Sequence, residues 1–187
     1  MMKELVLKNR SYRSFTEKRI SRETLLSYVD MARICASSAN LQALKFKVVN
    51  EKDECEKVFE CTKWAGYLPD MEIPPKGHEP AAYVIICIDT DITKNINGFY
   101  KDTGIAAQTI MLAAAEEGFG GCMIGSYNED KVKEAAGLPE NVTVSLILAL
   151  GEPDEEVRLT DFEGDIKDYR ENGIHYVPKR KLEEIIL

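Results

Sequence analysis

Two short polar segments near the start of the chain carry the residue types that could bind a charged organic ligand. The first, residues 10–15, reads Arg-Ser-Tyr-Arg-Ser-Phe. Arginine suits phosphate because its planar guanidinium can donate two parallel hydrogen bonds. The second, residues 37–42, reads Ser-Ser-Ala-Asn-Leu-Gln and offers hydroxyls and amides. Together these groups suit a ligand with a phosphate at one end and a flat ring bearing donors and acceptors at the other.

Each segment also has a simpler interpretation. Arg10 and Arg13 could be solvated surface arginines, and the polar residues of 37–42 could form the turn that commonly follows a helix. Gln42 is harder to explain in this way, because it leads directly into a predicted buried strand and would need a partner if it were covered. The residues alone leave these alternatives open.

Composition and charge narrow the class of protein. The 187 residues, 44% hydrophobic and 30% charged, are typical of one globular domain over 1–187. The net charge of −8, from 24 basic and 32 acidic residues, argues against a nucleic-acid-binding surface. An anionic ligand would therefore have to be met by a local group of basic residues. No apolar run reaches the roughly 18 residues of a membrane helix, and the charged start lacks the apolar core of a signal peptide. We expect a cytoplasmic protein without membrane contact.

The cysteines and histidines do not predict a metal site. The five cysteines are scattered and never have the spacing of a Cys-x-x-Cys motif, so neither zinc nor an iron–sulfur cluster is expected. His78 and His175 have no partners for a catalytic triad at a suggestive spacing. We interpret His175 as a structural residue, and we assign no catalytic side chain.

Hydrophobic patterns predict the elements that would position the polar segments. Ser21 is typical of an N-cap, and the helix that follows it runs to about Cys35 and separates the two segments. Apolar or alternating runs predict strands over 44–49, 81–89, 119–127 and 143–150, and helical patterns occur over 52–63, 100–117 and after Asn128. This mixed order indicates an α+β fold.

Two segments lack periodicity. Residues 66–80 are rich in proline and glycine and predict a long excursion. Residues 152–187 are polar and too weakly apolar to form a core of their own. We expect this tail to be an extended arm that wraps over something, most simply a second subunit.

Several short motifs occur in the order in which the FMN-dependent nitroreductase family has them. They are Arg-Ser-x-Arg-x-Phe at 10–15, Ser-x-x-Asn-x-Gln at 37–42, Asp-x-Gly-x-x-x-Gln at 102–108, a glycine turn at 118–121, Gly-x-Pro at 151–153, and a Lys/Arg pair before Leu-Glu-Glu at 179–184. Ala36, Ala43 and Asn9 depart from the prolines and arginine usual in the family. The chain resembles this family over nearly its whole length.

The resemblance implies a nitroreductase-like three-layer fold, with a central, mostly antiparallel mixed sheet flanked by helices and a C-terminal arm that reaches across a homodimer. It implies FMN at the subunit interface. The phosphate and ribityl end would be held by Arg10, Ser11, Arg13, Lys179 and Arg180, and the isoalloxazine by Ser37, Ser38 and Asn40 of the partner subunit with Gln42 nearby; Gly120 and Gly121 would approach the ligand through backbone.

The roles of two further sets of residues stay open. Asp102 could be a helix cap or a dipole partner for its own first turn. Trp64, Tyr67 and Met71 could cover the flavin, or could simply pack against the protein.

The resemblance also implies an activity. NADH or NADPH would reduce the flavin through its N5 atom, and a nitroaromatic, a quinone or a similar electron-poor acceptor would follow at the same face by ping-pong kinetics. One alternative is a non-catalytic module of the same fold that binds or delivers FMN or senses redox state. A third possibility is a specialised reductase that acts on a halogenated aromatic or an enoyl group. The sequence does not discriminate between these acceptors.

Overall fold

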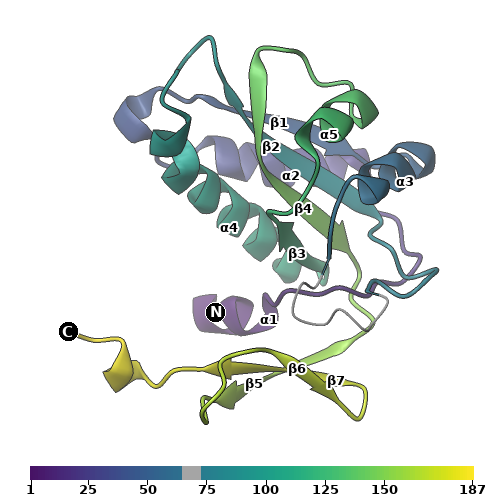
Figure 1. Ribbon diagram of the computed structural model, residues 1–187, viewed down its shortest axis with the longest axis vertical. Coiled ribbons are helices and arrows are strands. Elements are labelled where there is room, and N and C mark those ends of the chain that lie inside the picture. The colour runs from purple at the N-terminus through teal and green to yellow at the C-terminus, as the bar shows by residue number, and fades with distance from the viewer. Residues whose placement is uncertain (65–72) are drawn as a thin grey trace.

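The computed structural model describes residues 1–64 and 73–187, and its centre is a four-stranded antiparallel sheet (Figure 1). The strands lie in the order β1-β2-β4-β3. Their bounds are β1 Leu44–Val49, β2 Ala82–Asp89, β3 Gly120–Ile124 and β4 Val142–Gly151. The α+β class is confirmed. The predicted strand over 119–127 is shorter than expected, and the other three agree with the predicted runs to within one residue.

Helices cover both faces of this sheet, which gives the expected three layers (Figure 1). Successive side chains of a strand point to opposite faces, so Val84 of β2 packs with α2 and α4 whereas Tyr83 packs with α3 and α5. Every residue of β2 is buried, as a central strand covered on both faces requires. The helices are α1 Met2–Lys8, α2 Arg22–Arg33, α3 Lys52–Glu60, α4 Tyr100–Glu116 and α5 Glu129–Ala135.

Capping residues mark the starts of α2 and α5 and the end of α4. The Ser21 side chain accepts a hydrogen bond from the Thr24 backbone N at 3.0 Å, and Asn128 caps α5 in the same way. Gly118, with φ of +84°, follows α4 in the left-handed conformation that ends many helices. In the described ranges, every helix is too short or too polar to cross a membrane.

The tail forms a second, three-stranded sheet that the sequence patterns do not predict. Its strands are β5 Glu156–Asp161, β6 Tyr169–Glu171 and β7 Ile174–Lys179, in the order β5-β7-β6. β5 runs parallel to β7, and β6 runs antiparallel to it. We call this the C-terminal sheet. Beyond β7 the chain leaves the body of the molecule (Figure 1). The extended arm predicted for 152–187 is therefore largely folded, and its reach across a homodimer stays a prediction.

Candidate functional site

Basic residues from both ends of the chain line one cavity of about 610 Å³. Its size lies within the range of about 300–1,000 Å³ that is usual for small-molecule sites. α4 and β3 supply part of the wall, residues 9–13 supply another part, and the C-terminal sheet with the residues next to its strands supplies the rest. We call this the cationic cavity; its basic residues are Arg10, Arg13, Lys179 and Arg180, and Ser11 also lines it. The structure thus gathers all five residues of the predicted phosphate and ribityl end within one chain.

Pairing with β3 holds the first of these segments in place. The Tyr12 backbone N donates to the Gly121 carbonyl at 2.9 Å. A Cβ at Gly120 would lie 2.6 Å from the Tyr12 ring, and one at Gly121 would overlap the carbonyl oxygen of Ala149. The two glycines thus admit neighbouring segments of the chain. Neither lines the cationic cavity, where β3 contributes Met123 instead.

The two arginines of this segment retain donors for a ligand. Arg10 Nη2 donates to the Val6 carbonyl at 2.5 Å, but its Nε is buried without a partner in the described part of the chain. Arg13 Nη1 lies 3.4 Å from the Ser11 carbonyl and 3.9 Å from Asp168 Oδ2, both weak contacts. A buried unpaired donor is costly, so an anion in the cavity would satisfy groups that the chain leaves unpaired. This arrangement fits the phosphate of FMN.

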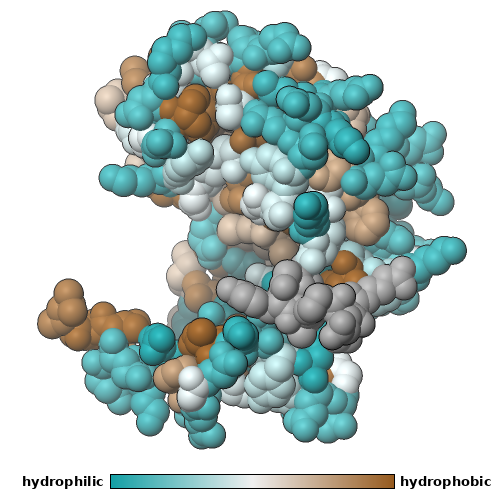
Figure 2. Space-filling view, viewed as in Figure 1, coloured by the Kyte–Doolittle hydropathy of each residue, from teal (hydrophilic) through white to brown (hydrophobic). Residues whose placement is uncertain are grey.

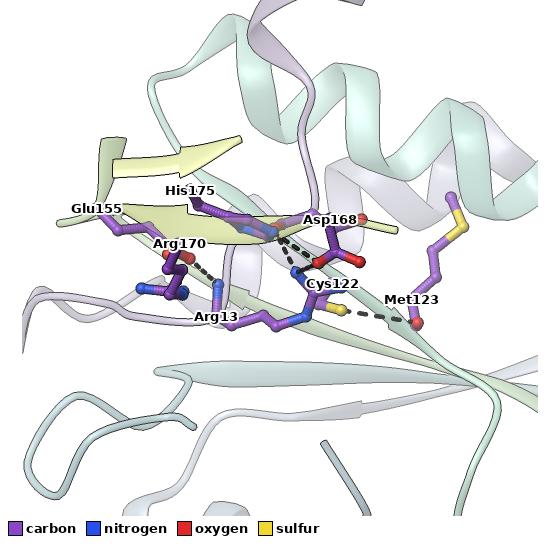
Figure 3. Close-up of polar contacts among 8 residues, drawn as sticks. Arg13, Cys122, Met123, Glu155, Asp168, Arg170 and His175 are labelled. Carbon is purple, nitrogen blue, oxygen red and sulfur yellow. Dashed lines mark hydrogen bonds and ion pairs between the residues drawn. The ribbon is translucent and has the colours of Figure 1, made fainter. Parts of the chain in front are cut away.

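A buried ion pair joins the arginine segment to the C-terminal sheet (Figure 3). The Glu155 side chain is only 4% exposed. It accepts hydrogen bonds from the backbone N of Arg13 and from the Arg170 guanidinium. This contact positions the C-terminal sheet against the segment that carries the arginines.

Asp168 and His175 belong to the same wall of the cavity, although the sequence predicted neither of them as a site residue. His175 is 1% exposed, and its Nε2 lies 2.7 Å from Asp168 Oδ2. The structural role of His175 stays a prediction. No signal in the sequence connects this pair to Arg13, because only the packing of the tail brings them together.

The second polar segment, residues 37–42, forms what we call the serine loop, and it is braced by Asp102 of α4. Ser37 Oγ and Ser38 Oγ donate to the Asp102 carboxylate at 2.8 and 2.6 Å, and the Ser38 backbone N donates at 2.8 Å. Burial alone would raise the pKa of Asp102, but hydrogen bonds from Ser38 and Ser37 outweigh it and hold the pKa below its usual range. The hydroxyl protons of both serines are therefore committed within the chain.

The remaining polar groups of the serine loop are exposed amides on a strained backbone. Ala39, Asn40 and Gln42 have φ of 51°, 54° and 52°, a conformation costly for residues other than glycine. Gln42 is exposed, so the partner it would need if covered is not required. Its side-chain Nε2 lies 3.4 Å from Asn40. Strain held in this way is typical of binding loops.

The serine loop does not line the cationic cavity of its own chain. It borders a separate cavity of about 130 Å³, with Ser37, Gln42 and Asp102 in its wall. Its assignment to the flavin of a second subunit stays a prediction.

Trp64 packs against Phe59, with ring centroids 6.1 Å apart, and donates to Thr62 Oγ1 at 2.9 Å. Whether Trp64 also covers the flavin stays a prediction. Tyr67 and Met71 lie outside the described residues.

Known proteins resemble this chain in sequence and in fold. The model of the nitroreductase family matches residues 6–67 and 79–152 and ends before the C-terminal sheet. A provisionally named NADH dehydrogenase/NAD(P)H nitroreductase of Archaeoglobus fulgidus is 26% identical over 182 residues, 95% of this chain and 94% of that protein. An NADPH-flavin oxidoreductase of Vibrio harveyi is 31% identical over 81% of this chain, which spans 65% of that protein. A nitroreductase family protein from Clostridium novyi NT superposes with a TM-score of 0.68 at 26% identity, covering 82% of this chain and 86% of that one.

Proposed function

The chain belongs to the nitroreductase family and is an FMN-dependent oxidoreductase with NADH or NADPH as electron donor, and we propose that it reduces nitroaromatic, quinone or similar electron-poor acceptors. The observation that carries the assignment of the cofactor is the cationic cavity, which gathers four basic side chains in a protein of net charge −8. The overall field of the protein repels anions, so a local cluster of this kind points to a specific anionic group.

Two groups of residues would hold the cofactor. Arg10, Arg13 and Ser11 would meet the phosphate from one side of the cationic cavity, and Lys179 and Arg180 would meet it from the C-terminal sheet. Each charge-assisted hydrogen bond contributes about 1.5–3 kcal/mol. Bound FMN supplies the hydride chemistry, while the protein supplies orientation and exclusion of side reactions. Donor and acceptor would occupy one place in turn, which gives ping-pong kinetics.

We also infer a homodimer in which each subunit completes the other's site. The C-terminal end carries exposed apolar side chains, and Figure 2 shows them standing clear of the body of the molecule; they are Leu182, Ile185, Ile186 and Leu187. Apolar surface of this kind marks an interaction site. The serine loop, with its exposed amides, also lies away from the cationic cavity of its own chain. A second copy would cover the apolar end and bring its serine loop to the flavin ring.

Anaerobic stopped-flow spectroscopy tests the activity. The FMN-loaded protein is mixed with NADH or NADPH, and then with a quinone or a nitroaromatic compound. We expect bleaching of the flavin band in the first step and its return in the second. Failure to take up FMN would contradict the proposal, and rapid bleaching would exclude a non-catalytic flavin-binding module. Sedimentation of the loaded protein as a monomer would contradict the shared site.

A further inference from the structure

The cationic cavity contains a carboxylate that opposes the charge of its neighbours. Asp168 lines the cavity together with the four basic residues, and its Oδ2 lies 3.9 Å from Arg13 Nη1. Figure 3 shows the Arg13 guanidinium and the His175 ring both turned toward this carboxylate. A site built only to attract phosphate would not place a negative charge here, because like charges at close range disfavour each other.

His175 holds this carboxylate in place. Its ring is 1% exposed, and its Nε2 hydrogen-bonds the same Oδ2 atom that faces Arg13, at 2.7 Å. The Asp168 side chain is 20% exposed, so solvent screens its charge only in part. A buried anchor of this kind keeps the carboxylate from turning away when an anion enters the cavity.

The Asp168 carboxylate attracts the Arg13 side chain but does not fix its orientation. At 3.9 Å the two groups form an ion pair too long to be a hydrogen bond. A phosphate can accept two parallel hydrogen bonds from one guanidinium. Arg13 is therefore free to turn to an incoming phosphate, but the charge of Asp168 stays beside the new anion.

We propose that Asp168, held by His175, is an internal counter-ion of Arg13 that competes with the phosphate of FMN and lowers the affinity for this cofactor. The inference rests on the proposed function of the cationic cavity. It goes beyond that function by assigning a residue that sets how readily FMN leaves. Asp168 lies in the tail beyond residue 152, where the match to the family model ends.

Binding titrations with two flavins test the proposal, because riboflavin has the ring of FMN without its phosphate. FMN and riboflavin are titrated into the cofactor-free full-length chain and followed by flavin fluorescence. Asp168→Asn removes the charge and keeps an oxygen that can accept from His175. We expect this variant to bind FMN about tenfold more tightly than the wild type, which corresponds to about 1.4 kcal/mol, and to bind riboflavin with unchanged affinity.

Asp165→Asn is the matched control. Asp165 is exposed in the same tail and accepts a hydrogen bond from the Lys167 backbone N at 3.0 Å. It does not line the cationic cavity, so its removal should leave FMN affinity unchanged. If both variants bound FMN more tightly to the same extent, the effect would come from the net charge of the tail. This result would overturn the proposal.

Three results separate this inference from the proposed function. Unchanged or weaker FMN binding by folded Asp168→Asn would overturn the inference alone. Equal tightening for both flavins would also overturn it, because the effect would not lie at the phosphate. A wild-type chain that binds neither flavin would overturn the proposed function itself. Circular dichroism checks folding, and if Asp168→Asn does not fold, Asp168→Ser, which also offers an acceptor, is titrated with the same expected result.

Discussion

The cationic cavity and the serine loop are rich in polar groups of the kinds that bind a flavin, yet they use these groups in opposite ways. In the cavity, Arg10 keeps a buried Nε without a partner in the described part of the chain, and Arg13 has only weak contacts. In the loop, Ser37 and Ser38 donate to the buried carboxylate of Asp102. The cationic cavity keeps hydrogen-bond donors available to a ligand, whereas the serine loop uses its hydroxyls to maintain its own conformation.

This difference changes the roles of the predicted contacts. The arginines can meet an anion directly, because their donors are available. The two serines act through the loop, and the exposed amides of Asn40 and Gln42 are the groups that it can offer. Residue types alone therefore do not say which polar atoms are free. Four experiments test this contrast, and the first should show the greatest change.

Gly121→Ala tests whether β3, which pairs with the arginine segment, needs its close approach to β4. The added methyl group would overlap the carbonyl oxygen of Ala149 across the sheet. Overpacking of this kind costs about 1–3 kcal/mol and occasionally more. We expect a loss of about 3 kcal/mol in the free energy of unfolding, measured in urea. Gly125→Ala is the control, because nothing lies within 4 Å of its added Cβ. Equal stability of the two variants would contradict the packing role.

Arg10→Ala tests whether the cavity holds its donors for a phosphate. Loss of this side chain should weaken FMN binding by roughly 2 kcal/mol or more, because a phosphate oxygen would be left without a charged partner. Fluorescence titration measures the affinity. Arg22→Ala removes an equal charge from an exposed position at the start of α2 and should have little effect. If Arg10→Ala bound FMN as tightly as the wild type, the phosphate assignment would be wrong.

Asp102→Asn tests the brace of the serine loop. The amide would present a donor where Ser37, Ser38 and a backbone N–H all donate, so buried groups would lose their partner. We expect a loss of about 1–3 kcal/mol in the free energy of unfolding. Asp130→Asn is the control, because Asp130 also lies in the first turn of a helix but is exposed. If the serine loop only packed loosely on α4, Asp102→Asn and Asp130→Asn would have the same free energy of unfolding.

The pH dependence of the stability difference between the wild type and Asp102→Asn should be the weakest of the four effects. The pKa of Asp102 is lower in the folded chain than its ordinary value, so ionised Asp102 stabilises the fold above the unfolded pKa of about 3.9. That contribution is lost as the pH falls through the folded pKa. The difference in unfolding free energy between the wild type and Asp102→Asn should therefore be larger at pH 7 than at pH 3. A constant difference across this range would show that the charge of Asp102 contributes nothing.

Local sequence patterns are enough to predict most of the helices and strands between residues 20 and 151. Helical and alternating patterns are local, and each is set by which face of a segment must be buried. The motif at 10–15 and the Lys/Arg pair at 179–180 also stand in the sequence, but their residue types leave other interpretations open, and only the family resemblance assigns them to a phosphate.

The packing of distant segments, in contrast, settles which polar atoms are paired and which are free. The C-terminal sheet has short strands and a parallel pairing between β5 and β7, so no local sequence pattern predicts it. Asp102 accepts hydrogen bonds from the serines, and Asp168 forms an ion pair with Arg13, although the partners lie far apart in the sequence. Such hydrogen-bond and ion-pair partners depend on tertiary contacts, and a periodic pattern contains no information about that choice.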